Sequence, residues 1–121
     1  MPAMHILLVE DEHLTAMVLR SMLEYRGFRV TCAYDGVEAL KSFTADPADL
    51  VVTDLKMPKM NGYELVSALR RLNEKLPIIV ATGIVEHQVL EPNDLKVLHK
   101  PIDPDQLLRA IAALSSQGSR H

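Results

Sequence analysis

The chain has 121 residues, of which 48% are hydrophobic and 24% are charged, a composition typical of one globular domain spanning residues 1–121. Its formal net charge of −3 gives no reason to expect binding to nucleic acid or to a membrane, and no apolar run approaches the ~20 residues that cross a bilayer. The segment at the start of the chain, residues 1–5, is too short and too uncharged to be a secretory signal. The single cysteine, Cys32, cannot form an internal disulfide, so a cytoplasmic location is expected.

Short apolar runs alternate with helical patterns along the chain. In chain order, strands are predicted at 5–9, 29–33, 50–53, 78–81 and 96–99, and helices at 13–26, 36–44, 62–72 and from 104 onward. The strand interiors are apolar without alternation, which is typical of strands covered on both faces. The sequence therefore predicts an α/β fold, a doubly wound parallel sheet built from right-handed crossovers.

Residues at the helix ends support these boundaries. Gly27 is placed to end the first helix, and Pro104 occupies the first position of the last one. The side chains expected to cap the other helix starts are Asp35, Asn61 and Asp103. Helix 62–72 carries an apolar stripe formed by Leu65, Leu69 and Leu72.

One segment departs from the alternation. A fourth helix is due between Thr82 and Lys100, but Pro92 disfavours helical backbone before it and breaks the helix after it. At most one or two turns fit between Val85 and Leu90, so we predict a short or irregular fourth helix in a mobile crossover. The domain core is expected at about 4–115, with 116–121 as a flexible tail.

Polar side chains directly follow four of the predicted strands. Glu10 and Asp11 follow the first strand, Asp54 the third, Thr82 the fourth and Lys100 the fifth. Because the carboxyl ends of parallel strands meet at one edge of the sheet, these residues are expected to lie together. Two like charges 4 Å apart repel by about 4 kcal/mol at an effective dielectric near 20, so the clustered acids need a cation or protons. Mg²⁺ fits, since it prefers oxygen ligands.

The same residue types suit phosphoryl transfer. The Asp54 carboxylate is the candidate nucleophile toward phosphorus, while a cation and the Lys100 ammonium would stabilise charge on the transferring group. The Thr82 hydroxyl can donate to a phosphoryl oxygen. Taken singly, each residue has an ordinary interpretation as a solvated acid, a surface lysine or a strand-forming threonine. Their order after successive strands favours the site.

Taken together, these motifs give the chain its resemblance to the response-regulator receiver domain of two-component signalling, over about residues 4–115. The matching motifs are Leu7-Leu8-Val9-Glu10-Asp11, Asp54-Leu55-Lys56-Met57-Pro58 with Asn61-Gly62, Ala81-Thr82, and Lys100-Pro101. The resemblance implies a flavodoxin-like sheet of five strands in the order 2-1-3-4-5. It also implies a phosphorylation switch that is not an enzyme beyond promoting its own phosphorylation and dephosphorylation.

Specific roles follow from that resemblance. Asp54 would accept a phosphoryl group from a histidine kinase or histidine phosphotransfer protein, and the altered surface would bind a downstream protein target. Asp11 and Asp54 would ligate Mg²⁺ directly, Glu10 through water, and Lys56 through its backbone carbonyl. Lys100 would pair with a phosphate or acid oxygen, followed by Pro101, and Thr82 would swing toward the phosphoryl group.

Two positions depart from the usual receiver pattern. Val97 stands where many receivers carry an aromatic residue three positions before the lysine, so an aromatic rotamer switch is not expected. Gly83 stands where alanine is common, and glycine would leave the phosphoryl group more open to water, which predicts a short-lived phosphoryl group. With the degraded fourth helix, Ala81-Thr82-Gly83 is similar to an atypical receiver subgroup in which that region is disordered.

Two alternative functions remain open from the sequence. One is a phosphorylation-independent receiver-like binding module, against which the complete acid set argues. The other is a hydrolase that uses an aspartyl phosphate, as in haloacid-dehalogenase-like phosphatases. Those enzymes carry the nucleophile after the first strand with a second acid two residues later, whereas Asp54 follows the third strand and Lys56 lies two residues on.

Overall fold

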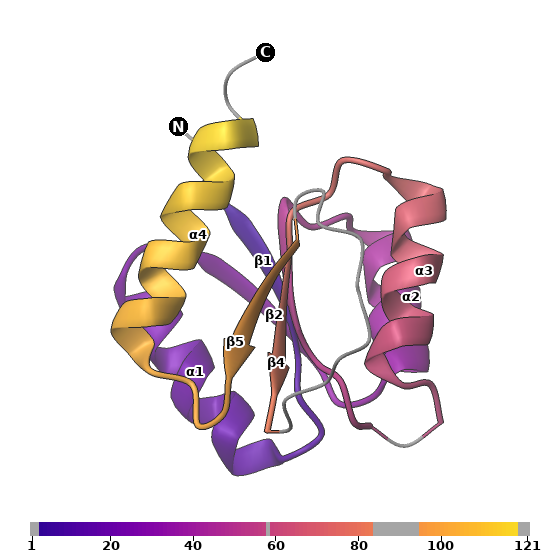
Figure 1. Cartoon of the computed structure of the whole chain (residues 1–121), viewed down its shortest axis with the longest axis horizontal. Helices are drawn as coiled ribbons and strands as arrows, with labels where there is room; N and C mark the ends of the chain where they lie inside the picture. The colour runs from indigo at the N-terminus through magenta and orange to yellow at the C-terminus, as the bar shows by residue number, and fades with distance from the viewer. Residues whose placement is uncertain (1–2, 58, 84–94, 119–121) are drawn as a thin grey trace.

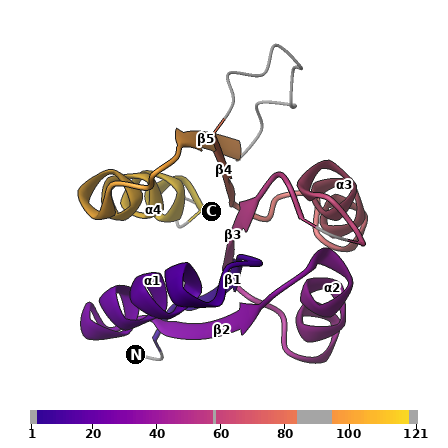
Figure 2. The same cartoon turned by 90° about the horizontal axis from the view of Figure 1, so that it is seen from below.

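A parallel sheet forms the centre of the molecule. The computed structural model describes residues 3–57, 59–83 and 95–118. The sheet has five strands in the order β2-β1-β3-β4-β5, and each neighbouring pair is parallel, which confirms the predicted fold class and strand order. Figure 1 shows the sheet between its helices, and Figure 2 shows the order of the strands. The strands are β1 (His5–Val9), β2 (Arg29–Ala33), β3 (Leu50–Asp54), β4 (Ile78–Thr82) and β5 (Leu95–His99).

Helices cover both faces of this sheet. They are α1 (His13–Tyr25), α2 (Gly36–Ala45), α3 (Gly62–Leu72) and α4 (Pro104–Gly118). Figure 2 shows α1 and α4 on one face and α2 and α3 on the other. The predicted short or irregular fourth helix falls at 84–94, outside the described residues, so α4 here is the helix that follows β5. It continues past residue 115, where the flexible tail was expected to begin.

Two hydrophobic layers, one on each face of the sheet, make up the core. Alternate residues of a strand serve opposite layers: Ile6 and Leu8 pack toward α1 and α4, while Leu7 and Val9 pack toward α2 and α3. All residues of β1, β3 and β4 are therefore buried, which explains their continuous apolar runs. The predicted stripe on α3 is only partly right, because Leu72 is 56% exposed at the end of that helix.

Local interactions fix where the helices begin and end. Gly27 follows α1 with φ +93°, a left-handed conformation that glycine adopts without strain. The Asp35 side chain accepts a hydrogen bond from the Glu38 amide at the start of α2. At the start of α3, Asn61 and Glu64 exchange side-chain to backbone hydrogen bonds in both directions. The predicted caps of α2 and α3 therefore form, and they set the residues at which these helices begin.

Among the described helices, none combines the length and the hydropathy that a membrane span would need.

Candidate functional site

Three carboxylates meet at the carboxyl edge of the sheet. Glu10 and Asp11 follow β1 and Asp54 ends β3, and the register that pairs Val9 with Thr53 places them side by side. One carboxylate oxygen from each of the three lies within 4.8 Å of the others. Glu10 is 4% and Asp54 6% exposed, whereas Asp11 is exposed. The predicted clustering of the acids is thus what the fold produces.

Lys100 reaches this cluster from the loop after β5. Its Nζ lies 2.6 Å from Asp54 Oδ2 and 3.6 Å from Glu10 Oε1. The Lys100 amide also donates to the Thr82 carbonyl at 2.9 Å, and the Lys100–Pro101 peptide bond is cis. Lys100, which follows the edge strand β5, thus neutralises part of the negative charge that Glu10 and Asp54 carry at the ends of β1 and β3.

Burial and charge shift the ionisation of both partners. Burial raises the pKa of the Glu10 carboxyl, and the nearby Asp54 charge adds to that rise against the opposing Glu12 amide and Lys100 ammonium. For Lys100, burial by itself would lower the pKa, but the hydrogen bond and charge of Asp54, helped by Glu10, raise it overall. The site therefore favours an ammonium at Lys100 and disfavours a full set of carboxylates.

This imbalance predicts a pH-dependent stability of the metal-free protein. Because the folded state raises the pKa of Glu10 above its ordinary value of 4.5, it binds more protons than the unfolded state just above that pH. This group's contribution to stability is therefore lost as the pH rises through that window. We expect Glu10→Gln to be more stable than wild type at pH 7 without Mg²⁺, by about 1 kcal/mol, the size of one partly screened like-charge contact.

Urea denaturation between pH 4 and pH 8 measures this effect. The difference in free energy of unfolding between Glu10→Gln and wild type should shrink toward zero at the acidic end of this range, where Glu10 is protonated. Glu74→Gln is the matched control, since Glu74 is exposed and lies before β4, near the amino ends of the strands and away from the acid cluster. Equal stability of wild type and Glu10→Gln at pH 7 would contradict the prediction.

The other predicted site residues occupy distinct places around the cluster. Thr82 is buried at the end of β4, whose register pairs Ala81 with Asp54. A Cβ built on Gly83 would meet no described residue within 4 Å other than its chain neighbours. The effect of Gly83 on phosphoryl lifetime stays a prediction. Val97 is 43% exposed on the edge strand β5. Lys56 is exposed in the loop between β3 and α3.

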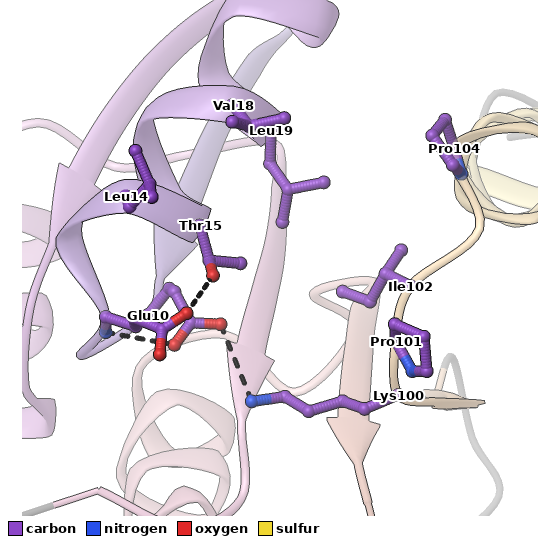
Figure 3. A pocket seen from close by; sticks show the side chains of 10 residues that line it. Glu10, Leu14, Thr15, Val18, Leu19, Lys100, Pro101, Ile102 and Pro104 are labelled. Carbon is purple, nitrogen blue, oxygen red and sulfur yellow. Dashed lines mark hydrogen bonds and ion pairs between the residues drawn. The ribbon is translucent and has the colours of Figure 1, made fainter.

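A groove extends from the acid cluster along α1. It encloses about 660 Å³, with Glu10 and Lys100 at one end. Figure 3 shows Leu14, Val18 and Leu19 of α1 on one side and Pro101, Ile102 and Pro104 on the other. Leu14 is 66% and Val18 60% exposed, so much of this wall is apolar surface open to solvent.

The groove was missed by reasoning from the sequence alone. Leu14 and Val18 fit the apolar periodicity of α1 and are read most simply as core residues. A signal was present, because Ala16, Leu19 and Leu23 already supply the buried face of α1 and leave these residues for another side. The loop after β5, which forms the opposite wall, is placed only by the tertiary fold.

The donor atoms at the cluster fit a small divalent cation. Carboxylate oxygens from three residues converge, and two of these residues, Glu10 and Asp54, are buried. Hard oxygen ligands with few protein carboxylates are the preference of Mg²⁺, which keeps several waters. The described residues hold no other comparable group of histidine, cysteine or acidic side chains.

Known proteins resemble this chain over nearly its whole length. The sequence profile described as "Response regulator receiver domain" matches residues 6–112. The chain is 36% identical over 115 residues to response regulator MprA of Mycobacterium avium (strain 104), covering 92% of this chain and 50% of that protein. It is 37% identical over 115 residues to MprA of Mycobacterium leprae (strain TN), again covering 92% and 50%. The chain thus spans about half the length of these curated relatives.

Solved structures give the same picture. The signal receiver domain of a signal transduction histidine kinase from Syntrophus aciditrophicus superposes with a TM-score of 0.87 at 28% identity, covering 98% of this chain and 95% of that one. The chemotaxis protein CheY4 of Vibrio cholerae superposes with a TM-score of 0.81 at 27% identity, covering 93% and 98%. The family motifs and the fold therefore agree.

Proposed function

The chain belongs to the response regulator receiver domain family, and from that premise we propose that Asp54 accepts a phosphoryl group from the phosphohistidine of a sensor kinase or phosphotransfer protein. The observation that carries this proposal is the contact between the Lys100 ammonium and the buried Asp54 carboxylate, 2.6 Å apart, beside two further acids. A structural ion pair needs one acid, whereas a phosphoryl group needs a nucleophile, a lysine and a place for a cation.

The chain's own residues account for the steps of transfer. An Asp54 carboxylate oxygen forms the new O–P bond as the N–P bond of the donor breaks, and the bonding pair returns to the imidazole nitrogen. Lys100 then moves from a carboxylate oxygen to the arriving phosphoryl oxygens, which carry more charge. When bound, Mg²⁺ supplies further positive charge there. Asp11, Asp54 and the Lys56 carbonyl would hold it directly, and Glu10 through water.

The switch itself would involve Thr82, which ends β4, and Lys100, which follows the adjacent strand β5. The Lys100 amide already donates a hydrogen bond to the Thr82 carbonyl, so movement of the chain at Thr82 is coupled to movement at Lys100. A swing from 1:99 to 99:1 requires about 5.5 kcal/mol of differential stabilisation. The ionic contacts of a phosphoryl group supply a few kcal/mol, so we expect a partial shift that a downstream protein target completes by binding.

The α1 groove suits the docking of the phosphodonor protein. Its apolar wall begins at Glu10 and Lys100, so a helical partner seated there would bring a phosphohistidine to the acid cluster. The exposed leucine and valine side chains of α1 offer the spacing that an amphipathic helix packs against. Protein docking and chemistry would thus use adjoining surfaces, which makes them separable by mutation.

A comparison of two phosphodonors tests this proposal. Val18→Glu places a charge in the groove wall and should slow transfer from a phosphorylated kinase or phosphotransfer protein by about tenfold, the effect of roughly 1.4 kcal/mol. Labelling by acetyl phosphate with Mg²⁺ should stay unchanged, because that small donor needs no docking. The matched control is Leu72→Glu, because Leu72 is similarly exposed at the end of α3 on the other face of the sheet (Figure 2).

Each outcome has a defined meaning. If Val18→Glu accepts phosphoryl groups more slowly from both donors, the substitution has damaged the acid cluster and not only the docking surface. If transfer from neither donor is slower, the groove is not the docking site. The absence of any phosphoryl mass increment in wild type with acetyl phosphate and Mg²⁺ would contradict the phosphoacceptor role. In that case a phosphorylation-independent binding module becomes the better account.

A further inference from the structure

The loop between β3 and α3, described at residues 55–57 and 59–61, packs closely against the first turn of α2 through Met60. A Cβ built on Gly36, the first residue of α2, would lie 2.6 Å from the Met60 carbonyl oxygen and 2.7 Å from the Met60 Cβ. Such distances are shorter than real contacts, so only glycine allows this approach. The loop that carries Lys56 is therefore supported from outside the acid cluster by a neighbouring helix.

An ion pair spans the same contact. Lys59 has φ +69°, a left-handed conformation that residues with side chains rarely adopt. Its Nζ lies 3.4 Å from Asp35 Oδ2, and Asp35 is itself fixed because its Oδ1 accepts from the Glu38 amide at 2.7 Å. That hydrogen bond, aided by the Lys59 charge, holds the pKa of Asp35 below its ordinary value.

The two ends of the loop are joined to each other beside the end of β3. The Gly62 amide donates to the Leu55 carbonyl at 2.8 Å, and a Cβ on Gly62 would lie 2.5 Å from the Asp54 carbonyl oxygen. These ends thus lie beside Asp54, whereas Lys59 and Met60 contact the start of α2. Lys56 lies between these two attachments.

We propose that the Asp35–Lys59 ion pair positions the loop so that the Lys56 carbonyl stays available to the cation. The inference rests on the proposed function, in which that carbonyl is a ligand of Mg²⁺. Asp35 and Lys59 act through the loop and touch neither the metal nor the phosphoryl group, so they are positioning residues.

Charge and position make opposite predictions for Lys59. Removing a lysine near an acidic site strengthens the attraction of that site for a cation, so electrostatics alone predicts tighter Mg²⁺ binding by Lys59→Met. Loss of the positioning contact predicts weaker binding. For Asp35→Asn the two effects point the same way, and asparagine still caps the helix. Lys59→Met is therefore the decisive variant.

NMR titration of the full chain with MgCl₂ measures the dissociation constant directly. We expect Lys59→Met and Asp35→Asn each to raise it about two- to fivefold, the range of one exposed ion pair. The double variant should bind Mg²⁺ at least as tightly as the weaker-binding of the two single variants, because both substitutions remove the same contact. Lys75→Met is the control, since it removes the same charge from the segment before β4, at the other edge of the sheet.

A second readout needs no metal. Amide hydrogen exchange at residues 56, 57 and 60 should be faster in Lys59→Met than in wild type and unchanged in Lys75→Met. If wild type binds Mg²⁺ and Lys59→Met binds it equally tightly or more tightly, this inference fails while the proposed function stands. If wild type binds no Mg²⁺, the metal role in the proposed function fails and the inference fails with it.

Discussion

Asparagine at position 54 is expected to lower phosphoryl incorporation from acetyl phosphate and Mg²⁺ by roughly a hundredfold or more, a barrier increase of about 2.7 kcal/mol. The carboxamide has nearly the shape of the carboxylate, so the packing around this buried residue should persist. It lacks the anionic oxygen that attacks phosphorus. It also removes one charge from the acid cluster, so the folded Asp54→Asn protein should be at least as stable as wild type without Mg²⁺.

Intact-mass measurement over a time course checks this result. The matched control is Asp105→Asn, which changes an exposed carboxylate in the first turn of α4 and should label as wild type does. Peptide mapping of the labelled wild type should place the phosphoryl group on the segment that contains residue 54. Undiminished labelling of Asp54→Asn at a different acid would show that the nucleophile lies elsewhere.

Loss of the Lys100 ammonium is expected to affect stability and chemistry together. Methionine keeps most of the apolar stem but leaves Glu10 and Asp54, both nearly buried, without their cation. Breaking a buried ion pair costs about 3–5 kcal/mol; because the Lys100 side chain is 33% exposed, we expect about 2 kcal/mol in urea denaturation at pH 7 without Mg²⁺. Labelling by acetyl phosphate should fall by at least about tenfold.

Two conditions should restore the stability of Lys100→Met. Mg²⁺ replaces the missing positive charge, so adding it should reduce the difference in free energy of unfolding between Lys100→Met and wild type. Lowering the pH toward 4.5 should narrow this difference as well, since Glu10, whose pKa burial raises, takes up a proton and no longer repels the Asp54 carboxylate. Lys96→Met on the exposed edge strand is the control and should change neither property. A Lys100→Met protein as stable as wild type at pH 7 would show that the ion pair contributes little.

Local sequence signals were enough to place most elements. The capping residues Asp35 and Asn61 and the terminator Gly27 act on backbone groups within a few positions of themselves, so their effects can be read from neighbouring residues. Leu72 shows where such reasoning fails. Its spacing matches the buried face of α3, but it is the last residue of the helix, where burial depends on what lies beyond the helix end.

The site divides in the same way. Glu10, Asp11, Asp54 and Lys100 could be predicted as a group because parallel strands all end at one edge, whatever the details of packing. The groove along α1 and the Asp35–Lys59 contact could not. Both join segments that are adjacent only after the helices have packed on the sheet, and neither has a spacing rule in the sequence.

The sequence by itself determined the order of strands and helices, the residues that end each strand, and hence the chemistry available at the sheet edge. Periodicity and capping are short-range effects, and a parallel sheet converts them into a shared site. Only the tertiary structure decided that the lysine ammonium lies 2.6 Å from the Asp54 carboxylate, which face of α1 stays open to solvent, and which helix supports the loop of Lys56. Those features depend on close packing between distant segments, where shifts of a few tenths of an ångström decide whether a contact forms.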